Sequence, residues 1–279
     1  MKRIVSLIMI FVMMLSLVGC GLIASIDYER GGVSDFTFEL NNDGASYTVT
    51  GYKDTTRSTT EIPSEYNGLP VTVIGDHAFA SYPYDTVTIP DTVTVIGKYA
   101  FHCSNLRSVV IPDSVIVIEE HAFDTSHWLN SVEIGKGVVE IKKYAFEYCK
   151  KLSRVVIPDN VTEIGTSAFS HCESLTDVVI GNGLTAINNT VFYNCENLLH
   201  ITVGDGVERI GAMAFGSCNK IKKVYFGKGI KTIASGTFGV CETAPDIYYA
   251  GSEAEWSGVY IEDGNPMFKS AKMHYGYTK

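Results

Sequence analysis

Two columns of apolar residues recur in register along most of the chain. A Phe returns every 22 or 23 residues, and an Ile stands five residues before each one. The Phe column consists of Phe79, Phe101, Phe123, Phe146, Phe169, Phe192, Phe215 and Phe238. Such fixed spacing indicates an internal repeat in which each copy packs against its neighbours.

One copy shows how a single coil is built. Val178 and Ile180 alternate with outward positions, which is typical of a short strand with one buried face. Gly181 then turns the chain, and Pro158 does so in the preceding copy. The segment around Phe169 has room for no more than about a turn of helix. Each copy therefore predicts a strand, a turn, an extended return and a short helical corner, with eight or nine coils stacked at about 4.8 Å per strand.

The period and the sequence motif of the repeats indicate one class of solenoid. Repeats of 20–29 residues with L-x-x-L-x-L are typical of leucine-rich repeats. The segments 157–165 (IPDNVTEIG) and 168–172 (AFSHC), with the first unit at 62–72, resemble the BspA-like leucine-rich-repeat family of bacterial surface proteins. The resemblance covers roughly residues 36–279 and implies an α/β repeat solenoid with 22–23 residues per coil, capped at both ends.

The chain departs from this family pattern in two respects. It has no regular Asn ladder after the strand. In addition, Glu119, Lys142, Asn188 and Ala234 stand where other copies carry Gly after the repeat Ile. We therefore expect that this turn does not require a positive φ.

The ends of the repeat array are expected to be capped, because a solenoid otherwise exposes its core. We assign residues 35–73 to an N-terminal capping hairpin and a first irregular repeat. Residues 74–243 form the leucine-rich-repeat solenoid, and residues 244–279 form the C-terminal cap. Within that cap, 248–256 resembles the cap common in the family, and 273–275 is expected to close it as a last strand.

The N-terminus has the features of an export signal. Lys2 and Arg3 precede an uncharged run from Ile4 to Leu17, which is too short to span a bilayer and suits a signal peptide. Residues 17–20 (LVGC) resemble the lipobox of bacterial lipoproteins. The resemblance implies a signal peptide at 1–19, lipidation of Cys20 and a lipid anchor and tether at 20–34. The alternative is an ordinary secretory signal or anchor in which Cys20 is accidental.

The charge of the chain excludes one class of partner. The formal net charge is −9, whereas nucleic-acid binding needs clustered Lys and Arg. A net negative charge of this size favours solubility but does not identify a partner.

Cysteines form a further column, three residues after the repeat Phe. Its members are Cys149, Cys172, Cys195, Cys218 and Cys241, and we expect Cys103 to belong with them. A column spreads its thiols along the rod, whereas a metal site needs converging ligands and a disulfide needs Cβ atoms about 3.8 Å apart. We therefore expect buried, reduced thiols.

No catalytic motif or metal motif stands out elsewhere. His77 and His121 are expected to be solvent-facing or capping residues, and the carboxylates show no acid/base spacing. We predict no catalytic residue, no metal site and no cofactor.

The outward side chains of the strands form the candidate contact face. The central column reads Thr88, Val110, Glu133, Val156, Val179, Thr202, Tyr225 and Tyr248. The charged column beside it reads Thr86, Ser108, Ser131, Arg154, Asp177, His200, Lys223 and Asp246. Exposed Val and Tyr occur at recognition surfaces, although both also favour strands for packing reasons alone. The ten positions from Arg154 and Val156 to Asp246 and Tyr248 are the preferred ligand contacts.

These features predict a membrane-anchored extracellular binding module rather than an enzyme. The family resemblance implies adhesion, and the expected ligand is a host or envelope protein or a glycan. The membrane partner is reached through lipid on Cys20. The alternatives are a structural spacer in the cell envelope and an enzyme of the β-helix type. The second is disfavoured because the outward columns carry only scattered carboxylates, Glu133, Asp177 and Asp246.

Overall fold

The computed structural model describes residues 33–54, 59–81, 83 and 85–278. The predicted signal peptide, Cys20 and most of the tether therefore lie outside the described residues. Within the described ranges, no helix combines the length and apolar character that crossing a bilayer requires.

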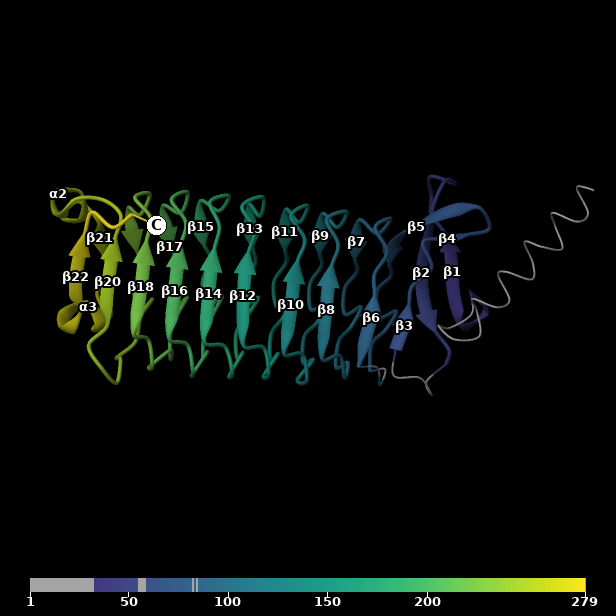
Figure 1. Ribbon diagram of the computed structural model, residues 1–279, viewed down its shortest axis with the longest axis horizontal. Coiled ribbons are helices and arrows are strands. Elements are labelled where there is room, and N and C mark those ends of the chain that lie inside the picture. The colour runs from purple at the N-terminus through teal and green to yellow at the C-terminus, as the bar shows by residue number, and fades with distance from the viewer. Residues whose placement is uncertain (1–32, 55–58, 82, 84, 279) are drawn as a thin grey trace, which may run out of the picture.

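Parallel strands, one per coil, form the most regular side of the rod, which we call the strand face (Figure 1). The strands are β3 (Thr59–Glu61), β6 (Thr86–Thr88), β8 (Ser108–Ile111), β10 (Ser131–Ile134), β12 (Arg154–Ile157), β14 (Asp177–Ile180), β16 (His200–Val203), β18 (Lys223–Phe226), β20 (Asp246–Tyr249) and β22 (Lys272–Tyr275). β3 to β10 make a four-stranded sheet, and β12 to β22 make a six-stranded sheet. The predicted leucine-rich-repeat solenoid is confirmed, and the terminal regions lengthen the row because they add β3 and β22.

A second layer of shorter strands contains the Ile column. These strands are β5 (Leu69–Ile74), β7 (Val95–Ile96), β9 (Val117–Ile118), β11 (Glu140–Ile141), β13 (Glu163–Ile164), β15 (Ala186–Ile187), β17 (Arg209–Ile210), β19 (Thr232–Ile233) and β21 (Tyr260–Ile261). Equivalent Ile residues pair between coils, as Ile118 does with Ile141. Neither Gly nor its replacements after the repeat Ile lie at positive φ, which confirms that this turn does not require it.

The third side of each coil is a corner centred on the repeat Phe. In the coil of Phe123, His121 and Thr125 lie at φ 58° and 61°, two residues before and two after the ring. A left-handed residue cannot continue a right-handed helix. The corner is therefore a hydrogen-bonded turn rather than the short helix expected. The only α-helices in the described part of the chain are α2 (Glu253–Trp256) and α3 (Met267–Ser270), both near the C-terminus.

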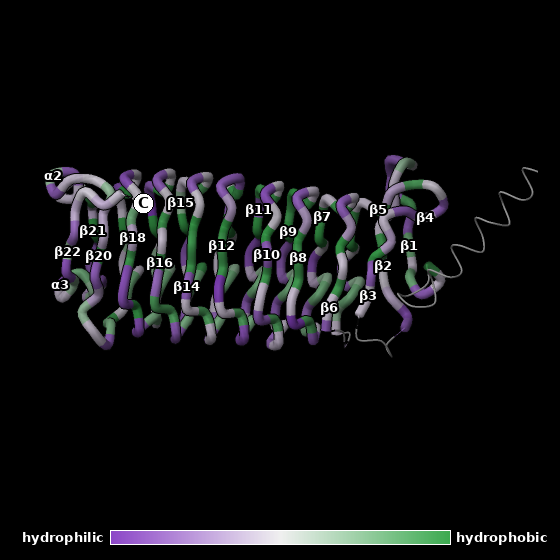
Figure 2. The backbone as a smooth tube through the Cα atoms, in the orientation of Figure 1, coloured by the Kyte–Doolittle hydropathy of each residue, from purple (hydrophilic) through white to green (hydrophobic). Residues whose placement is uncertain are grey.

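The core is a continuous stack between these three sides. All eight repeat Phe rings are fully buried, and neighbouring rings stack with centroids 4.9–5.4 Å apart. Figure 2 shows hydrophobic positions along the strands and hydrophilic positions at the turns along both edges of the rod. The strand-to-strand spacing of a β-ladder thus also sets the ring-to-ring spacing of the core.

The cysteine column lies beside the Phe stack, with two corrections, the first being that Cys241 at its C-terminal end is only half-buried. Cys172 is buried, and its thiol donates to the carbonyl of Phe146 in the preceding coil at 3.4 Å. Cys149, Cys195 and Cys218 make the equivalent contact. The expectation for Cys103 was wrong, because this residue is exposed and lies at the positive-φ position two residues after Phe101. Ser104 takes its place in the column, bonded to Ser126.

Each end of the core is covered by residues outside the repeat. After a 3-10 turn η1 (Val33–Asp35), β1 (Phe36–Leu40) and β2 (Tyr47–Tyr52) form an antiparallel hairpin, and β2 joins β5, which also pairs with β4 (Glu65–Tyr66). Phe36 and Tyr52 of this hairpin contact the ring of Phe79. At the other end, Trp256 of α2 packs on Phe226, and Phe268 of α3 meets Phe238 edge-on.

Candidate binding surface

Strand alternation produces the outward columns of the strand face. In β12, Val155 and Ile157 are buried, whereas Arg154 and Val156 are exposed. The parallel register places Arg154 beside Asp177 and Val156 beside Val179. The two columns predicted from the sequence are therefore continuous rows of neighbouring side chains from β12 to β20.

The N-terminal part of the central column carries two exposed valines on either side of Glu133, and the strand face is hollowed there. Val110 is 59% exposed and Val156 is 44% exposed, which is high for residues in the middle of a sheet. A hollow of about 910 Å³ lies over β6, β8 and β10, next to Val110. A second hollow of about 680 Å³ is lined by Val156, Val179 and Glu133. The strand face thus offers apolar side chains at the bottom of open depressions.

The second hollow coincides with an interruption of the sheet. In the described part of the chain β10 and β12 are neighbours without ladder pairing, so the four-stranded and six-stranded sheets end there. Figure 1 shows a wider step between these two strands than between β12 and β14. Lys136 and Asn160 flank this step and could hydrogen-bond a ligand that lies across it.

The charged column is largely paired within itself. His200 Nδ1 donates to Asp177 Oδ1 at 2.9 Å, and both side chains are 42% exposed. Partial burial would raise the pKa of Asp177, but hydrogen bonds from Thr176 and His200, with Arg154 nearby, lower it. At the C-terminal end, the hydrogen bond from His274 holds the pKa of Asp246 below its ordinary value. The column therefore presents fixed, alternating charges rather than one sign.

The aromatic end is a stack that the C-terminal segment completes. The rings of Tyr225 and Tyr248 lie 4.8 Å apart at an angle of 16°. His274 stacks on the other face of Tyr248 at 4.5 Å, and Tyr277 lies against both tyrosines. Tyr248 thus has both ring faces covered, and this end offers ring edges and hydroxyl groups to a ligand.

The sequence prediction for this surface missed two contributors. His274 and Tyr277 belong to the C-terminal cap, where the 22–23-residue spacing has ended. The repeat therefore could not predict that their side chains reach this surface. The register of β20 with β22 places Tyr248 beside His274. The second hollow was also missed, because it depends on the step between β10 and β12.

Comparison with known proteins adds information on the fold. No curated protein matches the chain. A leucine-rich repeat protein from Bacteroides ovatus is 20% identical, with 86% of this chain and 77% of that chain covered and a TM-score of 0.58. A leucine rich cell surface protein from Faecalibacterium prausnitzii is also 20% identical, covering 85% and 98% with a TM-score of 0.47. At these identities the first likeness concerns the fold alone.

The repeats themselves match a family model. The model of the BspA type leucine rich repeat region matches six copies, over residues 55–153 and 139–252. These ranges include the Phe, Ile and Cys columns that build the coils. The chain belongs to the family of proteins with BspA-type leucine-rich repeats.

Proposed function

We propose that the protein is an exported, membrane-anchored module that recognises another macromolecule, in the first place a protein, along its strand face. The observation that carries this proposal is that each of two hollows in the strand face contains an exposed valine, Val110 at 59% and Val156 at 44% exposure. Apolar side chains that are open to water in the middle of a rigid sheet gain free energy when a partner covers them. Binding, rather than catalysis, is the role that such a surface serves.

The rigidity of the surface supports the same function. From β14 to β20 the outward side chains are held by ladder pairing on both sides, as at Val179 between Val156 and Thr202. A preformed grid loses little conformational entropy when a ligand docks. The fixed charges of Arg154, Asp177 and Lys223 would set the register of the partner rather than its affinity.

The surface location belongs to the proposal as well. A family relative from Faecalibacterium prausnitzii is described as a cell surface protein. In this chain, lipid on Cys20 would fix the rod to the membrane, since two or three acyl chains contribute about 0.8 kcal/mol per buried CH₂.

The anchor is tested by replacing its attachment residue. With Cys20→Ser, we expect the protein to lose incorporation of labelled fatty acid and to leave the membrane fraction. Cys103→Ser is the control and should leave both unchanged. Unaltered lipid labelling of Cys20→Ser would contradict the anchor.

Binding is tested with the full chain in mild detergent on an array of host matrix proteins, glycans and bacterial envelope polymers. We expect a saturable hit that is weakened at least tenfold by the double variant Tyr225→Ser and Tyr248→Ser. The matched control is Tyr148→Ser with Tyr193→Ser, which removes two tyrosines from the corner side. The absence of any hit for the folded protein would contradict recognition and favour a spacer in the envelope.

A further inference from the structure

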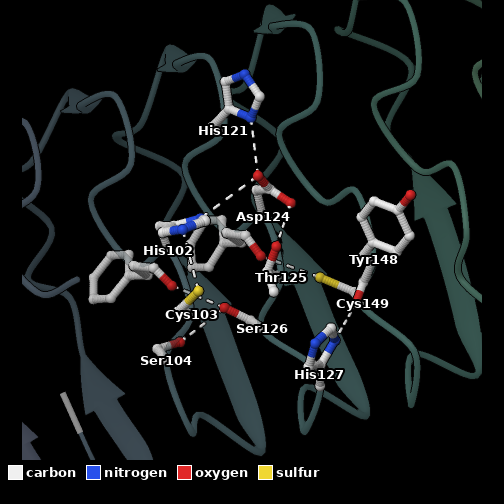
Figure 3. A network of polar contacts seen from close by, with 12 residues as sticks. His102, Cys103, Ser104, His121, Asp124, Thr125, Ser126, His127, Tyr148 and Cys149 are labelled. Carbon is white, nitrogen blue, oxygen red and sulfur yellow. Dashed lines mark hydrogen bonds and ion pairs between the residues drawn. The ribbon is translucent and has the colours of Figure 1, made fainter. Parts of the chain in front are cut away.

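The corner side of the coils carries a cluster of metal-binding side chains, away from the strand face (Figure 3). His121, Asp124 and Glu147 each direct one donor atom to a common region, with these atoms within 4.8 Å of one another. His121 Nδ1 lies 3.0 Å from Asp124 Oδ2, and His102 Nδ1 lies 3.5 Å from the same oxygen. Three donors from two successive coils therefore converge, and His102 of the preceding coil reaches the same Asp124 oxygen.

The repeat explains why these residues converge. His102, Asp124 and Glu147 each follow the repeat Phe directly, so stacking places them one above the other. His121 precedes Asp124 by three residues, and the turn Asp124 N–H to His121 C=O brings the two side chains together. The sequence analysis predicted no metal site because it judged the cysteines, histidines and carboxylates by their spacing along the chain, whereas here two columns of side chains meet.

The charges of the cluster are not balanced by the protein. Asp124 is buried, 8% exposed, and its ion-pair partners in the described residues are His102 and His121. Glu147 of the next coil is half-buried and directs a carboxylate oxygen to the same region. The carboxylates of Asp124 and Glu147 thus have no Lys or Arg partner among the described residues. A bound cation would stabilise them, because buried charges in proteins are paired or bind metals.

Each donor group also has an outer contact that orients it. Thr125 Oγ1 donates to Asp124 Oδ1 at 2.8 Å, and Ser170 Oγ donates to Glu147 Oε1 at 2.7 Å. Metal ligands in proteins are typically oriented by such outer hydrogen bonds. The second oxygen of each carboxylate is therefore the one available to a metal ion, which at Asp124 would replace the present contact of Oδ2 with His121 Nδ1.

The two histidines are oriented in a similar way. Cys103 Sγ lies 3.1 Å from His102 Nε2, and the His121 ring is stacked between Tyr99 and Tyr144 at 4.6 and 4.8 Å. His102 Nδ1 is buried and has no hydrogen-bond partner in the described part of the chain. A metal ion bound both by this nitrogen and by the Asp124 carboxylate 3.5 Å away would satisfy it.

We propose that His121, Asp124 and Glu147, with His102 as the fourth ligand, bind one divalent transition-metal ion, with Zn²⁺ as the preferred ion. Imidazole nitrogen and carboxylate oxygen are zinc donors at about 2.0–2.2 Å, and four ligands suit its tetrahedral geometry. The contacts of His121 and His102 with Asp124 are already as close as a shared ion requires, and rotation of the Glu147 side chain would bring its carboxylate to the same ion.

The ion would act as a clamp between coils. Asp124 lies in the coil that leads into β10, and Glu147 lies in the coil that leads into β12. These two strands are the neighbours that lack ladder pairing on the strand face. A metal bond at the corner would thus hold together two coils at the point where the sheet is interrupted.

The test is zinc binding by the full chain in mild detergent after removal of metal with a chelator. Titration calorimetry with ZnCl₂, and metal analysis after dialysis, should give one ion per chain with a micromolar or lower Kd. We expect Asp124→Asn to weaken binding at least tenfold, and Glu147→Gln to do so independently. Zinc should also raise the melting temperature of the native chain and of neither variant.

The matched control is His127→Gln, an exposed histidine in the same coil that contacts the Tyr148 carbonyl instead of the cluster. This variant should bind zinc as the native chain does. Circular dichroism in the presence of chelator establishes that each variant is folded. The proposal is overturned if the folded native chain binds no stoichiometric zinc, or if Asp124→Asn and Glu147→Gln both bind it unchanged.

Discussion

At the scale of single residues, the stability of the rod depends on identical contacts repeated along its axis. Phe169 illustrates this dependence, because it is fully buried and stacks on Phe146 and Phe192 at 5.0 and 5.4 Å. Removal of one ring would leave a cavity with both neighbours in place. The fixed spacing of the ladder would prevent the coils from closing over it.

Phe169→Ala is therefore expected to cost about 3–5 kcal/mol of unfolding free energy. Urea denaturation followed by circular dichroism measures this change as a lower midpoint. The control is Val240→Ala, since Val240 is 69% exposed and should change stability by less than about 0.5 kcal/mol. Equal midpoints for the two variants would refute the role of the stack.

The thiols provide a second test at this scale, because reaction with iodoacetamide needs the thiolate. Burial raises the pKa of Cys241 to about 11. Its thiolate fraction should therefore increase about tenfold per pH unit below that value, and so should its labelling rate between pH 8 and 10. The pKa values of the fully buried Cys149, Cys172 and Cys195 are raised by burial too, and these residues should react only on unfolding. Peptide mapping that found Cys172 labelled as fast as Cys241 would contradict the buried column.

At the scale of elements, the coils depend on hydrogen bonds that the corner of each one donates to the next. Within the array, the Phe215 N–H donates to the Thr237 carbonyl of the following coil at 3.0 Å. At the last corner the Phe238 N–H donates instead to Asn265 Oδ1 at 2.9 Å, and Asn265 Nδ2 donates to the Ala234 carbonyl at 2.8 Å. One buried side chain thus replaces the backbone of a missing coil.

Asn265→Ala should consequently cost about 2–4 kcal/mol, since it leaves the buried Phe238 N–H without a partner. Thermal melting of the variant is the measurement. Asn197→Ala, which removes a half-buried side-chain contact to the Glu173 carbonyl, should cost about 1 kcal/mol or less. Equal melting temperatures for the two variants would contradict the role of Asn265 as the residue that caps the last corner.

The elements differ in how well the sequence predicted their structure. The Phe and Ile columns predicted the coil, because their period follows directly from burial. The corner was not predicted, because its left-handed positions carry His121, Tyr144 or Ser167 rather than Gly, so composition did not mark them. The misplacement of Cys103 arose from the same corner, where moving by one residue exchanges a buried position for an exposed one.

At the scale of the whole molecule, the sites depend on residues that are distant in sequence. The hollow at Val156 requires the step between β10 and β12, and the aromatic end requires His274 and Tyr277 from the cap. The cluster at Asp124 joins residues separated by one coil length. Periodicity predicted which side chains point outward, but the distances between coils decided which of them meet.

The most direct test of recognition along the strand face compares two single variants. Each introduces one positive charge, the first on the strand face and the second on another side of the rod. Val156 and Ile116 are 44% and 43% exposed, and they lie in β12 on the strand face and beside β9 in the second layer. The affinity of Val156→Lys and of Ile116→Lys for the ligand found on the array is the measurement. We predict at least a tenfold loss for Val156→Lys and less than a twofold change for Ile116→Lys, because only the first charge would be buried by the ligand. Equal affinities of the two folded variants would contradict binding at the strand face.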